Sequence, residues 1–160
     1  MTMLMLTGIF FINGFAQNAP KIQRAYAFYS ITIPGMAMQD DKGNTIDPIA
    51  TIDRSIFVES PGTKMPDIRS VSYNKILYKA VIKKLDENAV QVGTNAETEK
   101  EIVLSAKKGN SLWKLELQLM KDTDKAPKDV KHIIIQGRYN KRPYSFNLYN
   151  ETKLASLPRY

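Results

Sequence analysis

The stretch Ser111–Lys121, SLWKLELQLMK, carries the alternation that decides the fold. Its large apolar residues recur at every second position, namely at Trp113, Leu115, Leu117 and Leu119. The residues between them are charged or polar. A β-strand places alternate side chains on opposite faces, whereas helical spacing would scatter these four around the axis. The stretch therefore predicts a strand with one core face and one solvent face.

Further segments are rich in β-branched and aromatic residues and are bounded by turn signals. They are Ile22–Ile33, Thr51–Glu59, Ile68–Tyr73, Ile76–Leu85, Ala89–Val92, Glu101–Ala106, Val130–Tyr139 and Tyr144–Tyr149. Such spacing is typical of strands that pair with their neighbours in sequence. Eight or nine antiparallel strands must bury their apolar faces against each other. We therefore expect an all-β chain forming a single-domain antiparallel β-sandwich over residues 17–160, immunoglobulin-like in architecture, with a closed β-barrel as the alternative.

The first sixteen residues contain no charged side chain and hold an apolar block, Met3–Ile12. The block is about half the roughly 20 residues that a membrane-spanning helix needs. It is followed by small residues at positions 14 and 16, as in a secretory signal peptide, although no Lys or Arg precedes it. We expect residues 1–16 to be a signal peptide cleaved between Ala16 and Gln17. The alternative is a buried N-terminal strand or helix.

This interpretation predicts a protein exported to the periplasm or the extracellular space, with no transmembrane segment in the mature chain. The sequence has no cysteine, which excludes disulfides and thiolate chemistry. Its net charge is +7, but basic and acidic residues are interleaved throughout. Because a surface that tracks phosphates needs basic residues concentrated on one face, we expect no nucleic-acid partner.

Catalytic and metal-binding patterns are weak. His132, the only histidine, lies at the mouth of an Ile-rich predicted core strand and has no second histidine or cysteine to join it. In the calcium-loop-like stretch from Asp40, Lys42 occupies a position that needs an oxygen ligand, so a turn is the better interpretation. Acidic residues within predicted strands could pair for glycoside hydrolysis but fall at positions assigned to solvent or a sheet edge; these are Asp53, Glu59 and Glu116. We expect no catalytic residue, cofactor or metal.

The densest basic and aromatic cluster lies around a predicted hairpin turn, Asn140–Pro143. The candidate contact surface consists of Arg138, Tyr139, Lys141, Arg142, Tyr144 and Tyr149. Outward tyrosines can stack on sugar rings or anchor a protein partner. The sequence thus favours an exported, non-catalytic binding protein whose partner is a protein or glycan of the cell envelope. Two alternatives stay open: a small extracellular hydrolase using paired carboxylates, and an inhibitor of an extracellular enzyme presenting loop 34–48 or loop 61–66.

Overall fold

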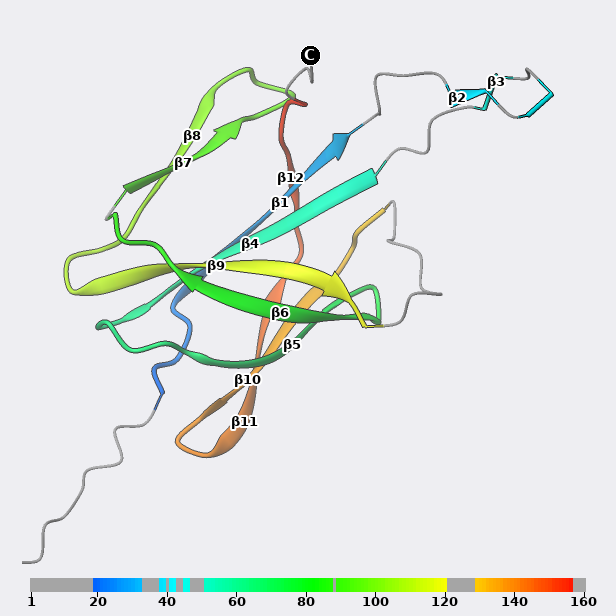
Figure 1. Cartoon of the computed structure of the whole chain (residues 1–160). Coiled ribbons are helices and arrows are strands. Elements are labelled where there is room, and N and C mark those ends of the chain that lie inside the picture. The colour runs from blue at the N-terminus through cyan, green and yellow to red at the C-terminus, as the bar shows by residue number, and fades with distance from the viewer. Residues whose placement is uncertain are drawn as a thin grey trace, which may run out of the picture.

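The computed structural model describes residues 19–32, 38–39, 41–42, 45–46, 51–87, 89–120 and 129–156 (Figure 1). These residues form strands, turns and connections, and none of them is helical. The strands are β1 (Arg24–Thr32), β2 (Met38–Gln39), β3 (Thr45–Ile46), β4 (Thr51–Pro61), β5 (Asp67–Tyr73), β6 (Ile76–Lys84), β7 (Ala89–Thr94), β8 (Glu101–Ser105), β9 (Asn110–Leu119), β10 (Ile133–Tyr139), β11 (Arg142–Leu148) and β12 (Thr152–Lys153).

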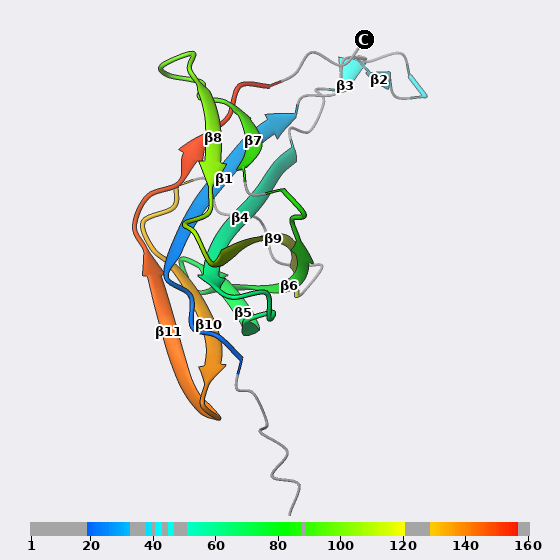
Figure 2. The ribbon, with the colours of Figure 1, turned by 90° about the vertical axis from the view of Figure 1, so that its left-hand side faces the viewer.

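One curled sheet contains eight of these strands, in the order β11-β10-β5-β6-β9-β4-β1-β12. All of its pairs are antiparallel except β1 with β12, which is parallel. The curl brings β11, at one edge, beside β1 near the other edge, with Cα atoms of the two strands within 8 Å (Figure 2). The small side chains of Ala25 and Ala27 face the interior here and let β1 come close to the core.

The interior of the curl is lined by alternate residues of its strands. Trp113 and Leu115 are buried there, and Leu117 and Leu119 pack against the same cluster. The predicted shared face of this strand is therefore confirmed. The opposite face of β9 is only partly exposed to solvent, because Leu112 is buried in a separate cluster.

That second cluster lies on the outer face of β1, β4 and β9. Phe28 and Phe57 meet there edge to face, with ring centroids 5.7 Å apart, and Leu112 joins them from β9. The antiparallel hairpin of β7 and β8 covers these residues and contributes Leu104. The central part of the curled sheet is thus packed on both faces, inwardly by the curl and outwardly by the hairpin.

Two tight hairpins fix the order of the strands. Asn74 and Lys75 connect β5 to β6, and Asn140 and Lys141 connect β10 to β11, all four with positive φ. Positive φ at both central residues is the geometry of the two-residue turn that suits the twist of antiparallel strands. The second hairpin was predicted, but its turn is shorter than expected, because Arg142 and Pro143 already lie in β11. Pro143 occupies an edge strand, as its missing N–H requires.

The structure confirms the all-β class. It does not confirm the immunoglobulin-like sandwich, because eight strands belong to one continuous hydrogen-bonded sheet, and the parallel β1–β12 pair departs from the expected antiparallel order. A closed barrel is not confirmed either, since no described ladder joins β11 to β12. The predicted signal peptide lies outside the described residues. In the calcium-loop-like stretch, β2 and β3 pair as an antiparallel hairpin.

Candidate functional site

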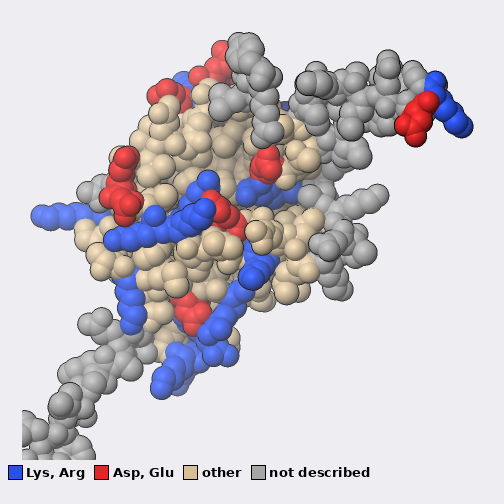
Figure 3. Space-filling model, in the orientation of Figure 1, with Lys and Arg blue, Asp and Glu red and all other residues tan. Residues whose placement is uncertain are grey.

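The end of the β10–β11 hairpin brings together five of the six residues predicted as a contact surface. Residue pairing sets Tyr139 opposite Arg142 and Arg138 opposite Pro143, with Lys141 in the turn. The three basic residues are exposed, and Tyr139 is 41% exposed. We call Arg138, Tyr139, Lys141, Arg142 and Tyr144 the hairpin surface. Basic side chains gather at this end of the molecule (Figure 3).

Tyr144 joins the hairpin surface to the start of β1. Its ring packs against the inner core, and its hydroxyl accepts a hydrogen bond from the N–H of Ile22 at 3.4 Å. Burial raises the pKa of this hydroxyl, although the Ile22 bond acts in the opposite direction. The ammonium of Lys21 lies 5.9 Å from the ring centroid, within reach of a cation–π interaction. Lys21 therefore extends the hairpin surface.

Two hollows flank Pro143 and Tyr144, one on each side of the hairpin. The first, of about 420 Å³, is lined by Arg69, Gln136, Gly137, Arg138, Pro143, Tyr144 and Ser145. The second, of about 410 Å³, is lined by Lys21, Tyr139, Asn140, Arg142, Pro143 and Tyr144. Lys21 and Arg69 were missed by sequence reasoning because they come from distant segments. No local sequence signal links either of them to the hairpin.

Tyr149, the sixth predicted residue, lies apart from the others. It follows the far end of β11 and stacks on His132, with ring centroids 5.4 Å apart and planes at 7°. His132 itself directly precedes β10, whereas the predicted strand, Val130–Tyr139, included it near its start. Tyr149 is 65% exposed. The stacked pair is a separate feature and does not contribute to the hairpin surface.

The acidic residues that were considered for hydrolysis are split between two environments. Asp53 and Glu116 line one hollow of about 360 Å³. Glu116 pairs opposite Ser55, so Asp53 is its diagonal neighbour, roughly 7–8 Å away between Cα atoms. A hydrogen bond from Lys83 holds the pKa of Glu116 below its ordinary value. A general acid needs the opposite shift.

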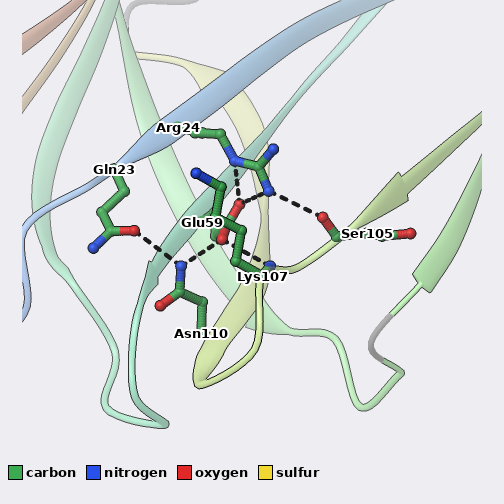
Figure 4. A network of polar contacts seen from close by, with 6 residues as sticks. All are labelled: Gln23, Arg24, Glu59, Ser105, Lys107 and Asn110. Carbon is green, nitrogen blue, oxygen red and sulfur yellow. Dashed lines mark hydrogen bonds and ion pairs between the residues drawn. The ribbon is translucent and has the colours of Figure 1, made fainter.

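Glu59 is fully buried, so its assignment to a solvent or edge position was wrong. It lies on the same face of β4 as Phe57, and the connection from β8 to β9 folds over it. Its carboxylate accepts hydrogen bonds from Arg24, from the N–H of Lys107 and from the side chain of Asn110 (Figure 4). Arg24 also donates to the carbonyl of Ser105 at 3.1 Å. The network ties the start of β1 to β4 and to the β8–β9 connection.

We expect Glu59→Gln to lower the unfolding free energy by about 2 kcal/mol at pH 7, the usual loss for bonds to a charged group. Burial acts to raise the pKa of Glu59, but the bonds from Asn110, Lys107 and Arg24 outweigh it and hold the pKa below 4.5. A lowered folded pKa gives stability that is complete above the unfolded pKa and is lost as pH falls through the folded one. Urea unfolding of both proteins from pH 7 to pH 3 should show the difference shrinking below about pH 4.5. A constant difference would contradict this account.

A second buried ion pair closes one end of the curl. Glu151 lies where the chain crosses from β11 to β12, and its carboxylate accepts a 2.9 Å hydrogen bond from Arg54 Nε. The two side chains are 2% and 5% exposed. The Arg54 guanidinium also lies 5.0 Å from the ring centroid of Tyr73. Burial raises the pKa of Glu151, although Arg54 and Tyr73 act to lower it. The pair joins the crossover between the two edge strands, β11 and β12, to the interior strand β4.

Among the residues that the structure describes, no group of three or more His, Asp or Glu side chains could hold a metal ion. Within that same part of the chain, no helix is long and apolar enough to span a bilayer. Comparison with protein families, curated proteins and solved structures finds no match to this chain.

Proposed function

We propose that the chain is an exported, non-catalytic binding protein that contacts a protein, envelope component or glycan through the hairpin surface. The observation that supports this most is the convergence of basic and tyrosine side chains on the two hollows beside Pro143 and Tyr144. Tyrosine and arginine are the residue types that most often carry binding energy at protein surfaces. A tight two-residue turn and the contact of Tyr144 with the core hold these side chains on a rigid support.

The other ionisable clusters have structural roles in this proposal. Glu59 joins three segments, and the Arg54–Glu151 pair joins the β11–β12 crossover to β4. Neither carboxylate lines the hollows beside the hairpin. Export rests on the uncharged apolar block before Ala16. The expected localisation is checked by fractionating cells that express the full chain, in which the processed protein should leave the cytoplasm.

A hydrolase using Asp53 and Glu116 is the second candidate, because both residues line one hollow and are diagonal neighbours on paired strands. The ion pair of Glu116 with Lys83, 2.8 Å long, argues against it. The ion pair keeps Glu116 ionised and holds its carboxylate against Lys83. The lowered pKa of Glu116 does not suit a proton donor.

The binding proposal is tested with immobilised protein and an envelope extract. We expect one envelope component to be retained by wild type and lost, by at least about ten-fold, on Arg138→Gln/Lys141→Gln/Arg142→Gln, since each 1.4 kcal/mol of contact energy is worth a factor of ten. The matched control is Lys79→Gln/Lys107→Gln/Lys108→Gln, which removes the same charge from exposed positions elsewhere. Equal retention by all three proteins, or equal loss in both variants, would contradict a specific role for the hairpin surface.

A further inference from the structure

An irregularity in strand pairing places one arginine beside the hairpin. Between Gln136 and Gly137 the register of β10 against β5 shifts, because Gln136 pairs with Ser70 while Gly137 pairs with Ile68. Arg69 is thus the extra residue of a β-bulge. Bulges bend a strand and redirect a side chain, and they are frequent beside functional sites. Arg69 here lines the hollow of about 420 Å³ that we call the bulge hollow.

Gly137 is required for this geometry. A Cβ atom at position 137 would lie 2.4 Å from the carbonyl oxygen of Asp67 and 3.0 Å from Cε1 of Tyr144. The backbone of β5 therefore lies so close to position 137 of β10 that only glycine, which has no Cβ atom, fits there. Any side chain at position 137 would also push against Tyr144, which forms part of the lining of the hollow. The glycine and the bulge together shape the hollow.

The lining of the bulge hollow combines two guanidinium groups with neutral hydrogen-bonding side chains. Residue pairing sets Gln136 opposite Ser145 and Arg138 opposite Pro143. Gln136 and Arg138 are exposed, and alternation places them on one face of β10, away from the buried Gly137. Arg69, at 59% side-chain exposure, completes the lining. The hollow thus offers two guanidinium groups, an amide, a hydroxyl and the apolar ring of Pro143.

Asp67 orients one of the two guanidinium groups. Arg69 Nε lies 2.8 Å from one carboxylate oxygen of Asp67, and Nη2 donates to the other oxygen at 3.1 Å. A guanidinium has five N–H donors in a rigid plane. A two-pronged contact with Asp67 fixes that plane and leaves further donor directions of the fork for a ligand. Such forks match the oxygens of sulfate, phosphate and carboxylate groups.

We propose that the bulge hollow binds an anionic sugar residue, with its sulfate, phosphate or carboxylate group held by Arg69 and Arg138. The inference rests on the proposed binding function and names its ligand class. The volume of about 420 Å³ lies in the range of small-ligand sites. Ser145 and the amide N–H₂ of Gln136 provide partners for ring hydroxyls, while the amide oxygen of Gln136 accepts a hydrogen bond from Ser70 at 2.9 Å. Pro143 provides apolar surface for the carbon face of the ring. Arg69 already has a carboxylate partner in Asp67, so the charge that the anion would balance is mainly that of Arg138.

The test is a calorimetric titration of the exported chain with a sulfated heparin-derived tetrasaccharide. Parallel titrations use the same tetrasaccharide without sulfate and carboxylate groups, and inorganic sulfate alone. We expect the sulfated sugar to bind at least ten-fold more tightly than either of the others. Arg69→Gln/Arg138→Gln should raise its dissociation constant at least ten-fold, whereas the matched control Lys79→Gln/Lys108→Gln should leave it within two-fold. Arg69→Lys, which keeps the charge but loses the fork, should give an intermediate value.

Thermal unfolding of every variant is measured first, so that loss of binding is read only from proteins that unfold like wild type. Equal binding of the neutral sugar would overturn the role of the anion, and equal binding of inorganic sulfate would overturn the role of the sugar. Equal weakening by the control pair would overturn the site, because attraction would then follow net charge alone. A chain that retains its envelope component through the hairpin surface but binds no sulfated sugar refutes this inference and leaves the proposed function standing. Failure of both experiments refutes both proposals.

Discussion

Replacing Arg54 by methionine is expected to lower the unfolding free energy by about 3–5 kcal/mol at pH 7, the usual loss when one partner of a buried ion pair is removed. The Glu151 carboxylate would stay in the interior without its counter-charge, because its side chain is only 5% exposed. The cation–π contact with Tyr73 would also be lost. The loss falls on the crossover from β11 to β12, which closes the curl.

The cost of Arg54→Met should decrease as pH falls. Burial already raises the pKa of Glu151 above 4.5 in the wild type, and Arg54 is a cause that lowers it. Removing Arg54 raises this pKa further, so the folded variant takes up a proton before the unfolded chain does. A raised folded pKa means that stability is gained as pH falls through the folded pKa toward the unfolded one. Urea unfolding of wild type and variant between pH 7 and pH 5 measures the change.

The control is the double variant Arg54→Met/Glu151→Leu, which removes both charges and fills the site with apolar side chains. Replacing a complete buried pair in this way is often neutral or stabilising. We therefore expect the double variant to recover most of the stability lost by Arg54→Met. A single variant as stable as wild type, or a double variant no better than the single one, would show that the pair does not hold the crossover.

The strands were predictable from the sequence because their signal is local. In Ser111–Leu119, the two-residue period of a strand is enough to assign Trp113 and Leu115 to one buried side. The structure confirms this assignment. Leu112 shows the limit of that signal. Its burial depends on the β7–β8 hairpin, and nothing in residues 111–119 predicts that this hairpin lies over β9.

The architecture was harder to predict because it depends on which strands meet. The alternation of each strand is compatible with a sandwich, a barrel or one curled sheet. The choice depends on long-range features such as Ala25 and Ala27 facing the interior where β1 approaches β11. The parallel pairing of β1 with β12 likewise joins residues more than 120 positions apart in the chain.

The candidate site shows the same division. The hairpin surface was predictable because Arg138–Tyr144 is contiguous and its turn has a local signature. Arg69 and Lys21 were not, since only the bulge in β5 and the packing of Tyr144 place them beside the hairpin. Glu59 was assigned to solvent by alternation alone, and its partners at residues 24, 107 and 110 come from other segments.

Trp113→Ala is expected to lower the unfolding free energy by about 3–5 kcal/mol, as large-to-small changes in cores do. Trp113 is 4% exposed and lies in the inner cluster between β4 and β6, where Val58 and Lys84 pair with it. Its indole Nε1–H donates to the buried hydroxyl of Ser60 at 2.9 Å. The alanine variant therefore creates a cavity in the middle of the curl and leaves a buried hydroxyl without this partner.

Trp113→Phe separates these two contributions. Phenylalanine keeps most of the apolar volume but cannot donate to Ser60, so its cost should be about 1–2 kcal/mol, the loss of one buried hydrogen bond with a small void. Because Trp113 is the only tryptophan, unfolding is followed by far-ultraviolet circular dichroism in urea rather than by fluorescence. The strands on both sides of β9 pack through this side chain, so the loss should appear as a lower midpoint with an unchanged denaturant slope. An alanine variant within 1 kcal/mol of wild type would mean that the curl does not depend on the apolar side of β9.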